Sequence, residues 1–495
     1  MSSEKHKPVK DQASGLRYWM ERVLAEIDKV RRDFAPDPVH DLRVALRRCR
    51  SMADGLTAID PDKTWKTMRR EGRRLFKCLG ELRDVQVLSE WARQLGGPDD
   101  PVTVAMLAYL AQREQELKQE AGKPLQAFDR EKWRGWIARL DARTRRLPLG
   151  GAVFQLSAIQ AWNEAHELHK QAARNRSNLS YHRLRIGLKK LRYTVENFLP
   201  HLHAQWGGDL KNLQDWLGEL HDLSVFWEAA VRIRAFPDAD SRKRWHVLID
   251  QERERRIGQY RAKMMGDNSL WVVWRAGLPP PSRLQALSLR MIQKWGSFHG
   301  INLPNAYNVR RLALQLLDGL GPGKSTGRQE TRKPRAILHA AAVLHNLARP
   351  SGKTRNNRSA RGLLRRLPPS PGLSAESLHL IAMIVHCHRG RFRGTEDAGY
   401  ASLNPGQRQL VMLLAGILRL ARTLSRKGAE PVGGLTVDKA GDSIVIWIEG
   451  YAEFGPLAEK LARARYLLEC ACQRPVLFRS TSTEPLPVES PQTSA

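Results

Sequence analysis

Residues 39–51 read VHDLRVALRRCRS, and their pattern governs how the rest of the chain is interpreted. On a helix, spacings of three and four residues place the cationic side chains of this stretch along one face. The row consists of His40, Arg43, Arg47 and Arg50, with Arg48 beside it. Like charges at these spacings destabilise an isolated helix by roughly 0.2–0.5 kcal/mol per pair. An anion that offsets this repulsion best explains the row, and phosphate groups are the first candidates.

A second stretch, YHRLRIGLKKLRY at residues 181–193, repeats this pattern. Its row consists of His182, Arg185, Lys189 and Arg192, with Lys190 beside it, and each member follows its counterpart at the same offset of 142 (182 − 40). The sequence LGELRD at 79–84 also recurs, as LGELHD at 217–222, at an offset of 138 (222 − 84). Two matches in the same order indicate an internal duplication. We therefore expect two similar helical bundles, each with a basic helix face.

A further basic helix is expected from KTMRREGRRLFK at residues 66–77. Its cations again recur at spacings of three and four residues: Lys66, Arg69, Arg70, Arg73, Arg74 and Lys77. The corresponding region near 205–216 has Lys211 as its obvious cation, so the two copies are not equally basic. For any one of these helices, a solvated charged face is the alternative interpretation. The duplication favours a common role, because solvation alone does not predict the same row twice.

Two pairs of duplicated side chains each allow two interpretations. His40 and His182 either donate a hydrogen bond to a ligand or complete the first helical turn. Asp84 and Asp222 end the LGELRD and LGELHD copies, and they either hold neighbouring cations in place or form structural ion pairs between helices. A metal site that pairs His40-Asp41 or His221-Asp222 with distant ligands is less favoured, because the sequence fixes no third or fourth ligand.

The composition favours a polyanionic partner. The chain has 495 residues, with 82 Lys and Arg against 51 Asp and Glu, and a formal net charge of +31. A charge this large attracts nucleic acid, an acidic membrane face or polyphosphate. The five cysteines lack paired metal spacing and fit a reducing compartment. Because no stretch offers about 18 uninterrupted apolar residues, we expect a cytoplasmic protein without membrane insertion.

The hydrophobic pattern predicts a mainly α chain in two parts. Residues 12–270 read almost entirely as helix, and residues 271–284, which contain three consecutive prolines, read as a linker. The second part, 285–480, is predicted to begin with helices and to end with a small sheet that includes a hairpin at 433–450. Residues 481–495 are a polar tail rich in Pro and Ser that we expect to be disordered.

The first part resembles a known family in four stretches: VHDLRVALRRCRS, LGELRDVQVL, YHRLRIGLKKLRY and LGELHDLSVF. It looks like a CHAD domain, the conserved histidine α-helical domain. The resemblance implies two four-helix bundles with pseudo-twofold symmetry, whose basic helices face a central groove that binds inorganic polyphosphate at polyphosphate granules. By position, it assigns phosphate binding to His40, Arg43, Arg47, Arg48, Arg50, His182, Arg185, Lys189, Lys190 and Arg192, with Arg73, Arg74 and Lys77 in addition.

The second part resembles the helical HD region of the exopolyphosphatase and guanosine-pentaphosphate phosphatase family, in stretches such as AAVLHNLA at 341–348 and IAMIVHCHRGR at 381–391. Phosphohydrolases of the HD kind need imidazoles and carboxylates around a metal ion. The expected ligand positions here hold Asn305 or Asn308, Asn346 after His345, Asn356-Asn357-Arg358 and Arg422, while His388 is kept. Amides and guanidinium groups are poor substitutes. We therefore expect no catalytic metal and no cofactor, and expect His345, His386 and His388 to be hydrogen-bonded helix residues.

These observations favour noncatalytic binding of inorganic polyphosphate through the duplicated rows of Arg, Lys and His. General RNA or DNA binding is the first alternative, because a nucleic-acid backbone offers the same phosphates. Against it, the basic stretches contain few aromatic residues on which bases could stack, Tyr193 being the main exception. The second alternative is an exopolyphosphatase-like phosphohydrolase that acts through the second part. The sequence does not set the oligomeric state.

Overall fold

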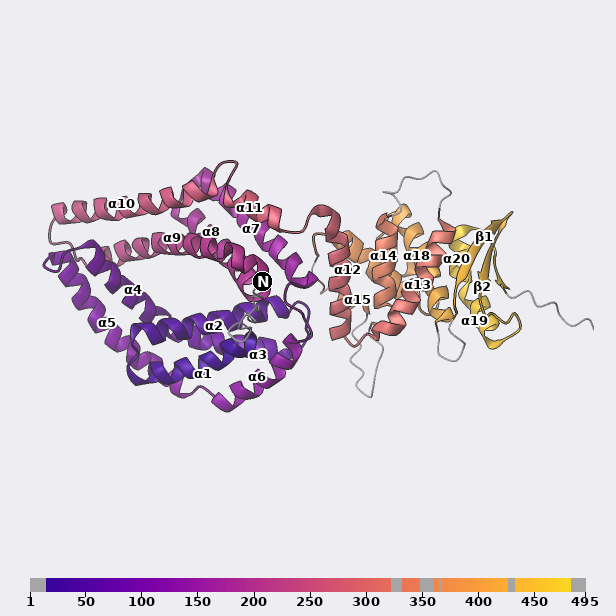
Figure 1. Ribbon diagram of the computed structural model, residues 1–495, viewed down its shortest axis with the longest axis horizontal. Coiled ribbons are helices and arrows are strands. Elements are labelled where there is room, and N and C mark those ends of the chain that lie inside the picture. Colours follow the sequence, from indigo (N-terminus) through magenta and orange to yellow (C-terminus); the bar gives the residue numbers. More distant parts are fainter. Residues whose placement is uncertain are drawn as a thin grey trace, which may run out of the picture. The chain divides into compact units, whose positions relative to one another are not determined.

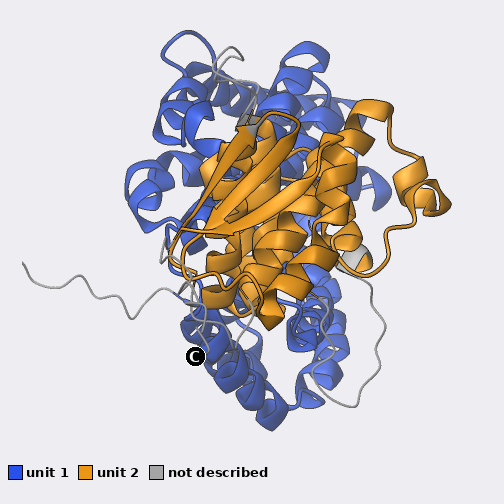
Figure 2. Cartoon of the chain, turned by 90° about the vertical axis from the view of Figure 1, so that its right-hand side faces the viewer, with its two compact units in different colours: residues 1–284 blue, residues 285–495 orange. Residues whose placement is uncertain are grey.

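The structure is a computed structural model that describes residues 15–321, 332–347, 360–364, 367, 369–425 and 432–481. It divides into two compact units, Met1–Leu284 and Gln285–Ala495 (Figure 2). Both units consist mainly of helices, which confirms the predicted fold class. None of the helices in the described ranges is long and apolar enough to cross a membrane. Nearly all of the predicted tail, 481–495, lies outside the described residues.

The N-terminal unit contains two successive groups of helices (Figure 1). The first group comprises α1 (Leu16–Asp33), α2 (Pro36–Leu56), α3 (Lys63–Cys78), α4 (Gly80–Leu95), α5 (Pro101–Gln126) and α6 (Arg130–Thr144). The second comprises α7 (Ala152–Asn175), α8 (Asn178–Phe198), α9 (Pro200–Arg232), α10 (Ala239–Met264) and α11 (Leu270–Gly277). The two basic rows therefore lie on α2 and α8, as the sequence predicts.

The helix boundaries follow the predicted duplication. The offset from α2 to α8 is 142 at both ends (178 − 36 and 198 − 56), and the offset from α5 to α10 is 138 at both ends (239 − 101 and 264 − 126). The offset changes from 142 to 138 at the connection that follows the basic helix. In the first copy residues 57–62 connect α2 to α3, whereas in the second Leu199 alone connects α8 to α9. Helices α3 and α4, which meet at Leu79, together correspond to the single helix α9. Helices α2 to α5 of the first copy thus correspond to α8 to α10 of the second.

The apolar backs of the two basic helices are buried. Leu42 and Leu46 on α2, and Leu184 and Leu191 on α8, have no exposed surface. The pattern also places Ile186 among the apolar residues of α8, but 55% of its surface is exposed. Helix α2 packs against α8, and α4 packs against α9, so the two copies contact each other through equivalent helices. The packing of α2 on α8 brings the two basic rows into one region.

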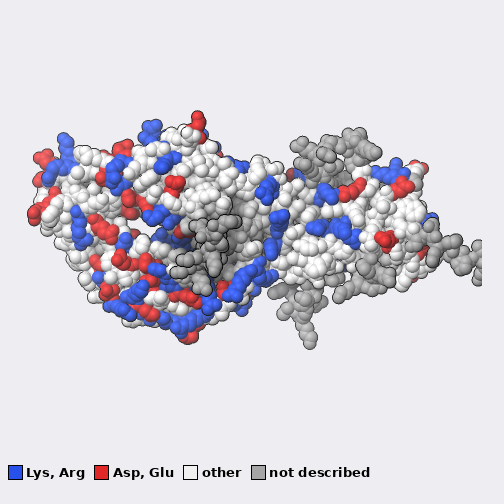
Figure 3. Space-filling model, in the orientation of Figure 1, with Lys and Arg blue, Asp and Glu red and all other residues white. Residues whose placement is uncertain are grey.

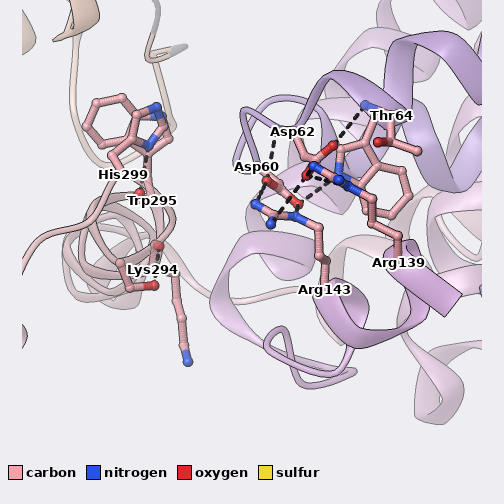
Figure 4. A network of polar contacts seen from close by, with 10 residues as sticks. Asp60, Asp62, Thr64, Arg139, Arg143, Lys294, Trp295 and His299 are labelled. Carbon is pink, nitrogen blue, oxygen red and sulfur yellow. Dashed lines mark hydrogen bonds and ion pairs between the residues drawn. The ribbon is translucent and has the colours of Figure 1, made fainter. Parts of the chain in front are cut away.

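A buried carboxylate links α3 to α6 in the first copy (Figure 4). Asp60 is 2% exposed, and its Oδ2 accepts a hydrogen bond of 2.8 Å from Trp65 Nε1. Arg143 of α6 forms an ion pair with the same carboxylate. Asp62, the N-cap residue of α3, accepts a hydrogen bond of 2.9 Å from Arg139 Nη2. These contacts satisfy charged groups that would otherwise be buried without a partner.

The C-terminal unit begins with helices and ends with a small sheet (Figure 1). Its helices are α12 (Pro281–Phe298), which starts just before the unit boundary, α13 (Leu303–Leu320), α14 (Arg332–Leu344), α15 (Ala360–Leu364), α16 (Ala375–Cys387), the 3₁₀ helix η2 (Gly394–Glu396), α17 (Ala398–Ala401), α18 (Pro405–Leu424), α19 (Pro456–Ala464) and α20 (Tyr466–Cys472). Its strands are β1 (Leu435–Ala440), β2 (Ser443–Ile448) and β3 (Val476–Ser480).

The predicted hairpin is formed by β1 and β2. The two strands pair antiparallel, with Leu435 opposite Ile448, and β3 joins β2 in parallel. Helix α13 packs on β1, and Gly319 of α13 lies at the closest approach. A Cβ atom at Gly319 would lie 2.6 Å from Val437 Cβ, which is too close for any side chain. The glycine therefore lets helix and sheet pack tightly.

The stretch 271–284 contains more helix than a linker suggests. Helix α11 extends to Gly277 and α12 begins at Pro281, so residues 278–280 alone separate them. Proline is compatible with the first turn of a helix, because the N–H group that it lacks would have no partner there. The run of prolines thus marks a helix start as well as the boundary between the units.

We predict that replacing Asp60 with Ala destabilises the N-terminal unit by about 2–4 kcal/mol, because the change removes the acceptor of Trp65 Nε1 and the ion pair of Asp60 with Arg143. The measurement is urea denaturation followed by circular dichroism, with the transition of this unit fitted separately. Asp28→Ala is the matched control, since Asp28 pairs with Arg130 at the surface and its loss should cost less than about 1 kcal/mol. Equal effects of the two variants would contradict the prediction.

Candidate functional site

Four cations from the two basic helices converge in the N-terminal unit. We call them the central cluster: Arg43 and Arg47 of α2, and Arg185 and Lys189 of α8. Arg47 Nη1 donates a hydrogen bond of 3.1 Å to the hydroxyl of Tyr193, which joins α2 to α8 directly. Within the described residues, none of the four pairs with a carboxylate. The cluster is therefore a concentration of positive charge without direct ion pairs among the described residues.

Phe76 of α3 supports the row on α2. The guanidinium carbons of Arg43, Arg47 and Arg50 lie 4.2, 5.7 and 5.2 Å from the centroid of its ring. Arg43 Nη1 also donates a hydrogen bond of 3.0 Å to the carbonyl oxygen of Phe76. An aromatic face attracts guanidinium groups without neutralising their charge. One side chain thereby holds three cations of the row in place.

The duplicated glycines lie against the duplicated arginines. A Cβ atom at Gly80 would be 3.5 Å from Arg43 Nη1, and one at Gly218 would be 3.7 Å from Arg185 Nε. Arg185 Nε is itself buried and has no hydrogen-bond partner among the described residues. A buried donor without a partner is costly, and a ligand that accepts its hydrogen bond removes that cost. Arg43 and Arg185 thus occupy equivalent places in the two copies.

Burial and mutual repulsion lower the pKa values of the central cluster. The pKa of Lys189 falls to about 7, first because the ammonium group is desolvated and then because Arg185 and Arg47 repel it. Burial, with Arg47 and Arg83 as further contributors, lowers the pKa of Arg43 to about 10. Burial also lowers the pKa of Arg185. An anion in the cluster would favour the charged forms and so reverse these shifts.

Asp84 and Asp222 lie near the cluster without touching its cations. Burial raises the pKa of both carboxyl groups, to about 6 for Asp222, while Arg43 and Arg185 respectively act in the opposite direction. Neither carboxylate has a hydrogen bond or ion pair with another described residue. Within the described ranges, the direct ion pair between helices is therefore missing, and the carboxylates act on the neighbouring cations through space.

Several predicted binding residues are engaged in ion pairs instead. Arg48 is 7% exposed and pairs with Glu196 of the other copy. The remaining pairs are Lys190 with Glu164, Arg192 with Glu196 at 3.3 Å, and Arg74 with Glu71 at 2.6 Å. Arg50 and Arg73 line a surface hollow, and Lys77 is exposed on α3. Only some of the predicted phosphate-binding residues thus belong to the central cluster.

The two histidines of the rows lie in unlike surroundings. His40 is exposed, and partial desolvation with Arg83 and Arg47 nearby lowers its pKa. The ring of His182 lies 4.9 Å from that of His221, and both line a pocket of about 280 Å³. Both His40 and His182 are the fifth residues of their helices, and Ser177 caps α8 instead. Neither therefore completes the first turn as a cap.

The C-terminal unit brings two of the predicted ligand positions, 345 and 388, close together. His345 and His388 are each 1% exposed, and their rings lie 6.4 Å apart. Each Nδ1 donates to the carbonyl oxygen three residues earlier, at 2.7 Å for His345 and 2.8 Å for His388. His386 lies elsewhere, with Nε2 at 2.9 Å from Asp397 Oδ2. All three histidines are thus hydrogen-bonded, but only His386 lies within a helix, because His345 and His388 come directly after the ends of α14 and α16.

Amides and guanidinium groups surround these histidines. Asn308 Nδ2 donates to Ser425 Oγ at 3.0 Å, and the Ser425 hydroxyl donates to Asn305 Oδ1 at 3.3 Å. Burial, with Arg389 and Arg422 nearby, lowers the pKa of His388 well below its usual value. Within the described part of the chain, no group of three or more His, Cys, Asp or Glu side chains is arranged to hold a metal ion. Residues 356–358, also predicted as substituted ligands, lie outside the described ranges.

The comparisons with known proteins match the two halves separately. Residues 15–231 match the model of the CHAD domain, and residues 288–440 match that of the Ppx/GppA phosphatase, domain III. Among solved structures, the chain is similar to the crystal structure of the CHAD domain from the plant Ricinus communis, with 23% identity, a TM-score of 0.36, and coverage of 55% of this chain and 96% of that chain. No curated protein matches the chain. The N-terminal region of the chain is therefore a CHAD domain, and its C-terminal part is related to domain III of the Ppx/GppA phosphatases, as their sequence motifs predict.

Proposed function

We propose that the protein binds linear inorganic polyphosphate at the central cluster and does not hydrolyse it. The observation that carries this proposal is the convergence of Arg43, Arg47, Arg185 and Lys189 without a carboxylate partner among the described residues. The two family matches indicate a protein related to polyphosphate. We further propose that the protein acts in the cytoplasm, at polyphosphate granules.

The chemistry of polyphosphate suits this cluster. Each unit of the polymer carries a negative charge and free oxygen atoms, so successive units can accept hydrogen bonds from successive cations. The guanidinium fork of arginine can donate to two phosphate oxygens at once. A polymer in the cluster would also supply an acceptor for Arg185 Nε, which has none among the described residues. Binding would thereby relieve both the repulsion and the missing hydrogen bond.

Nucleic acid is the less favoured ligand. Single-stranded RNA and DNA are usually held through stacking of their bases on aromatic side chains. Phe76 is the aromatic residue that contacts the row on α2, and three arginine side chains lie over its ring. The Tyr193 hydroxyl accepts a hydrogen bond from Arg47, and the guanidinium of Arg48 lies over the Tyr193 ring. Because cations occupy these rings, the site favours a ligand made of phosphates alone.

Hydrolysis through the C-terminal unit is also less favoured. Amide or guanidinium side chains stand at positions where a metal-dependent phosphohydrolase needs carboxylates. Arg422 and Arg389 lie near His388 and would repel a divalent cation there. We therefore propose that the unit has lost catalysis while keeping the fold.

Replacing Arg43, Arg47, Arg185 and Lys189 together with Gln should weaken binding of long-chain polyphosphate by at least about 100-fold, because each removes a charge-assisted contact. The measurement is isothermal titration calorimetry at near-physiological salt, with helicity checked by circular dichroism. The control removes four exposed cations outside the cluster, namely Arg93, Arg232, Lys243 and Lys263, and should bind almost as tightly as the wild type. Retained affinity in the cluster variant, or equal affinity of the wild type for single-stranded RNA, would count against the proposal.

The affinity should decrease as the pH rises from about 6.5 to about 8.5. In the free protein the pKa of Lys189 is about 7, so the ammonium group loses its proton within this range, and an anion binds its charged form better. Protonation of Asp222, with a pKa of about 6, removes a nearby negative charge and should strengthen binding further at lower pH. Lys189→Arg keeps the charge and should flatten the profile across the same range. A wild-type profile as flat as that of the variant would contradict the role of Lys189.

Incubation with polyphosphate and Mg²⁺ or Mn²⁺ should release no phosphate above the blank. The physical reason is that Arg389 and Arg422 lie near His388 and would repel a metal ion that activates water there. The measurement is a colorimetric assay of free phosphate, with wild-type protein and His388→Ala side by side. Metal-dependent release that disappears in His388→Ala would refute the noncatalytic proposal.

A further inference from the structure

We propose that a basic hollow between α2 and α3 is a second phosphate-binding site, which holds the units of a polyphosphate chain that extend beyond the central cluster. This inference rests on the proposed function. The hollow has a volume of about 700 Å³. It is lined by Arg50 and Asp54 of α2 and by Lys66, Thr67, Arg69, Arg70 and Arg73 of α3. We call this site the α2–α3 hollow.

The charge in the α2–α3 hollow is strongly unbalanced. Asp54 is the single carboxylate of its lining, and Arg69 Nη1 donates to Asp54 Oδ1 at 2.6 Å. The other four cations, Arg50, Lys66, Arg70 and Arg73, have no carboxylate partner in the described part of the chain. Over much of the visible face of this unit, Lys and Arg are interspersed with Asp and Glu (Figure 3). An anionic ligand would compensate the excess charge in the hollow.

Arg50 connects the hollow to the central cluster. Its guanidinium lies over the ring of Phe76, at 5.2 Å from the centroid, beside Arg43 at 4.2 Å and Arg47 at 5.7 Å. Arg50 is also part of the lining of the hollow. The cations of α2 therefore continue from the cluster to the hollow without interruption. A polymer bound at the cluster can extend along this row and keep a cation beside each successive phosphate.

Among the described residues, the second copy lacks an equivalent set of unpaired cations. Arg192 is the counterpart of Arg50, and its Nε pairs with Glu196 at 3.3 Å. Lys211 is the obvious cation of the region that corresponds to α3, and it pairs with Asp215 at 3.0 Å. The basic path therefore extends from the cluster toward the first copy. A polyphosphate longer than the cluster would gain contacts on that side.

The lining of the hollow also points to the chemical class of the ligand. It contains cations, one carboxylate and the Thr67 hydroxyl, and its residues include no aromatic side chain and no large apolar one. A nucleotide or a lipid would leave its base or acyl chain without a contact surface there. A chain of bare phosphates needs only cations and hydrogen-bond donors. The hollow therefore fits inorganic polyphosphate better than a phosphate ester.

The test replaces Lys66, Arg70 and Arg73 with Gln in the full chain. These residues are exposed, so the substitutions leave the core intact. Titrations with long-chain polyphosphate and with tripolyphosphate are compared over a series of salt concentrations. For long chains, the affinity should fall roughly tenfold, and the slope of log affinity against log salt should decrease by about 2, since each phosphate contact on a single strand contributes roughly 0.7. Binding of tripolyphosphate, which the cluster alone can hold, should remain unchanged.

A matched control removes the same charge at exposed sites outside the hollow. It replaces Arg93, Arg232 and Lys263 with Gln and should alter the affinity for long chains less than twofold. Unchanged affinity and slope in the hollow variant, an equal loss in the control, or an equal loss for tripolyphosphate would each overturn the second site while leaving the cluster proposal in place. If the wild type binds neither ligand, the proposed function fails and the second site fails with it.

Discussion

The packing of α2 against α8 holds like charges close together, and much of the N-terminal unit compensates for that repulsion. Leu42 and Leu184 are buried, so the cationic sides of both helices must share one region. Phe76 attracts three of the arginines, and Asp84 and Asp222 lower the positive potential from a distance. Apolar burial thus provides the free energy that keeps the site charged before any ligand arrives. Such a site trades stability of the empty protein for readiness to bind.

The C-terminal unit illustrates a different relation between fold and chemistry. Its helices bring the rings of His345 and His388 within 6.4 Å of each other and place Arg422 near His388, while Asn305 and Asn308 contact Ser425. Buried apolar residues along α14, α16 and α18 hold these helices together, and their packing requires no metal ion. Under the proposed loss of catalysis, the fold persists because core packing and ligand identity involve different residues.

The sequence predicted those features that depend on local spacing. The rows on α2 and α8 and the hairpin of β1 and β2 follow from residues a few positions apart, and the duplication follows from motifs that recur in the same order at nearly the same offset. It could not separate Arg47 from Arg48, which are adjacent in the chain, because Glu196 of the other copy determines that Arg48 is buried in an ion pair. The low pKa of Lys189 and the hollow beside Arg50 likewise depend on which helices pack together. Tertiary contacts, rather than periodicity, assign these side chains their roles.

The ion pair of Arg48 has a consequence for how the two copies have diverged. In a symmetric pair of bundles, Arg48 with Glu196 would be matched by Lys190 with Asp54, since these counterparts share the offset between α2 and α8 (190 − 48 and 196 − 54). Instead Lys190 pairs with Glu164, and Asp54 pairs with Arg69. Two identical subunits of a homodimer could not carry different residues at equivalent positions, because every substitution would occur in both subunits at once. Fusion of the copies in one chain allows each half to evolve independently. One pair of equivalent positions can therefore form an ion pair between the copies, while the other pair forms ion pairs within each copy.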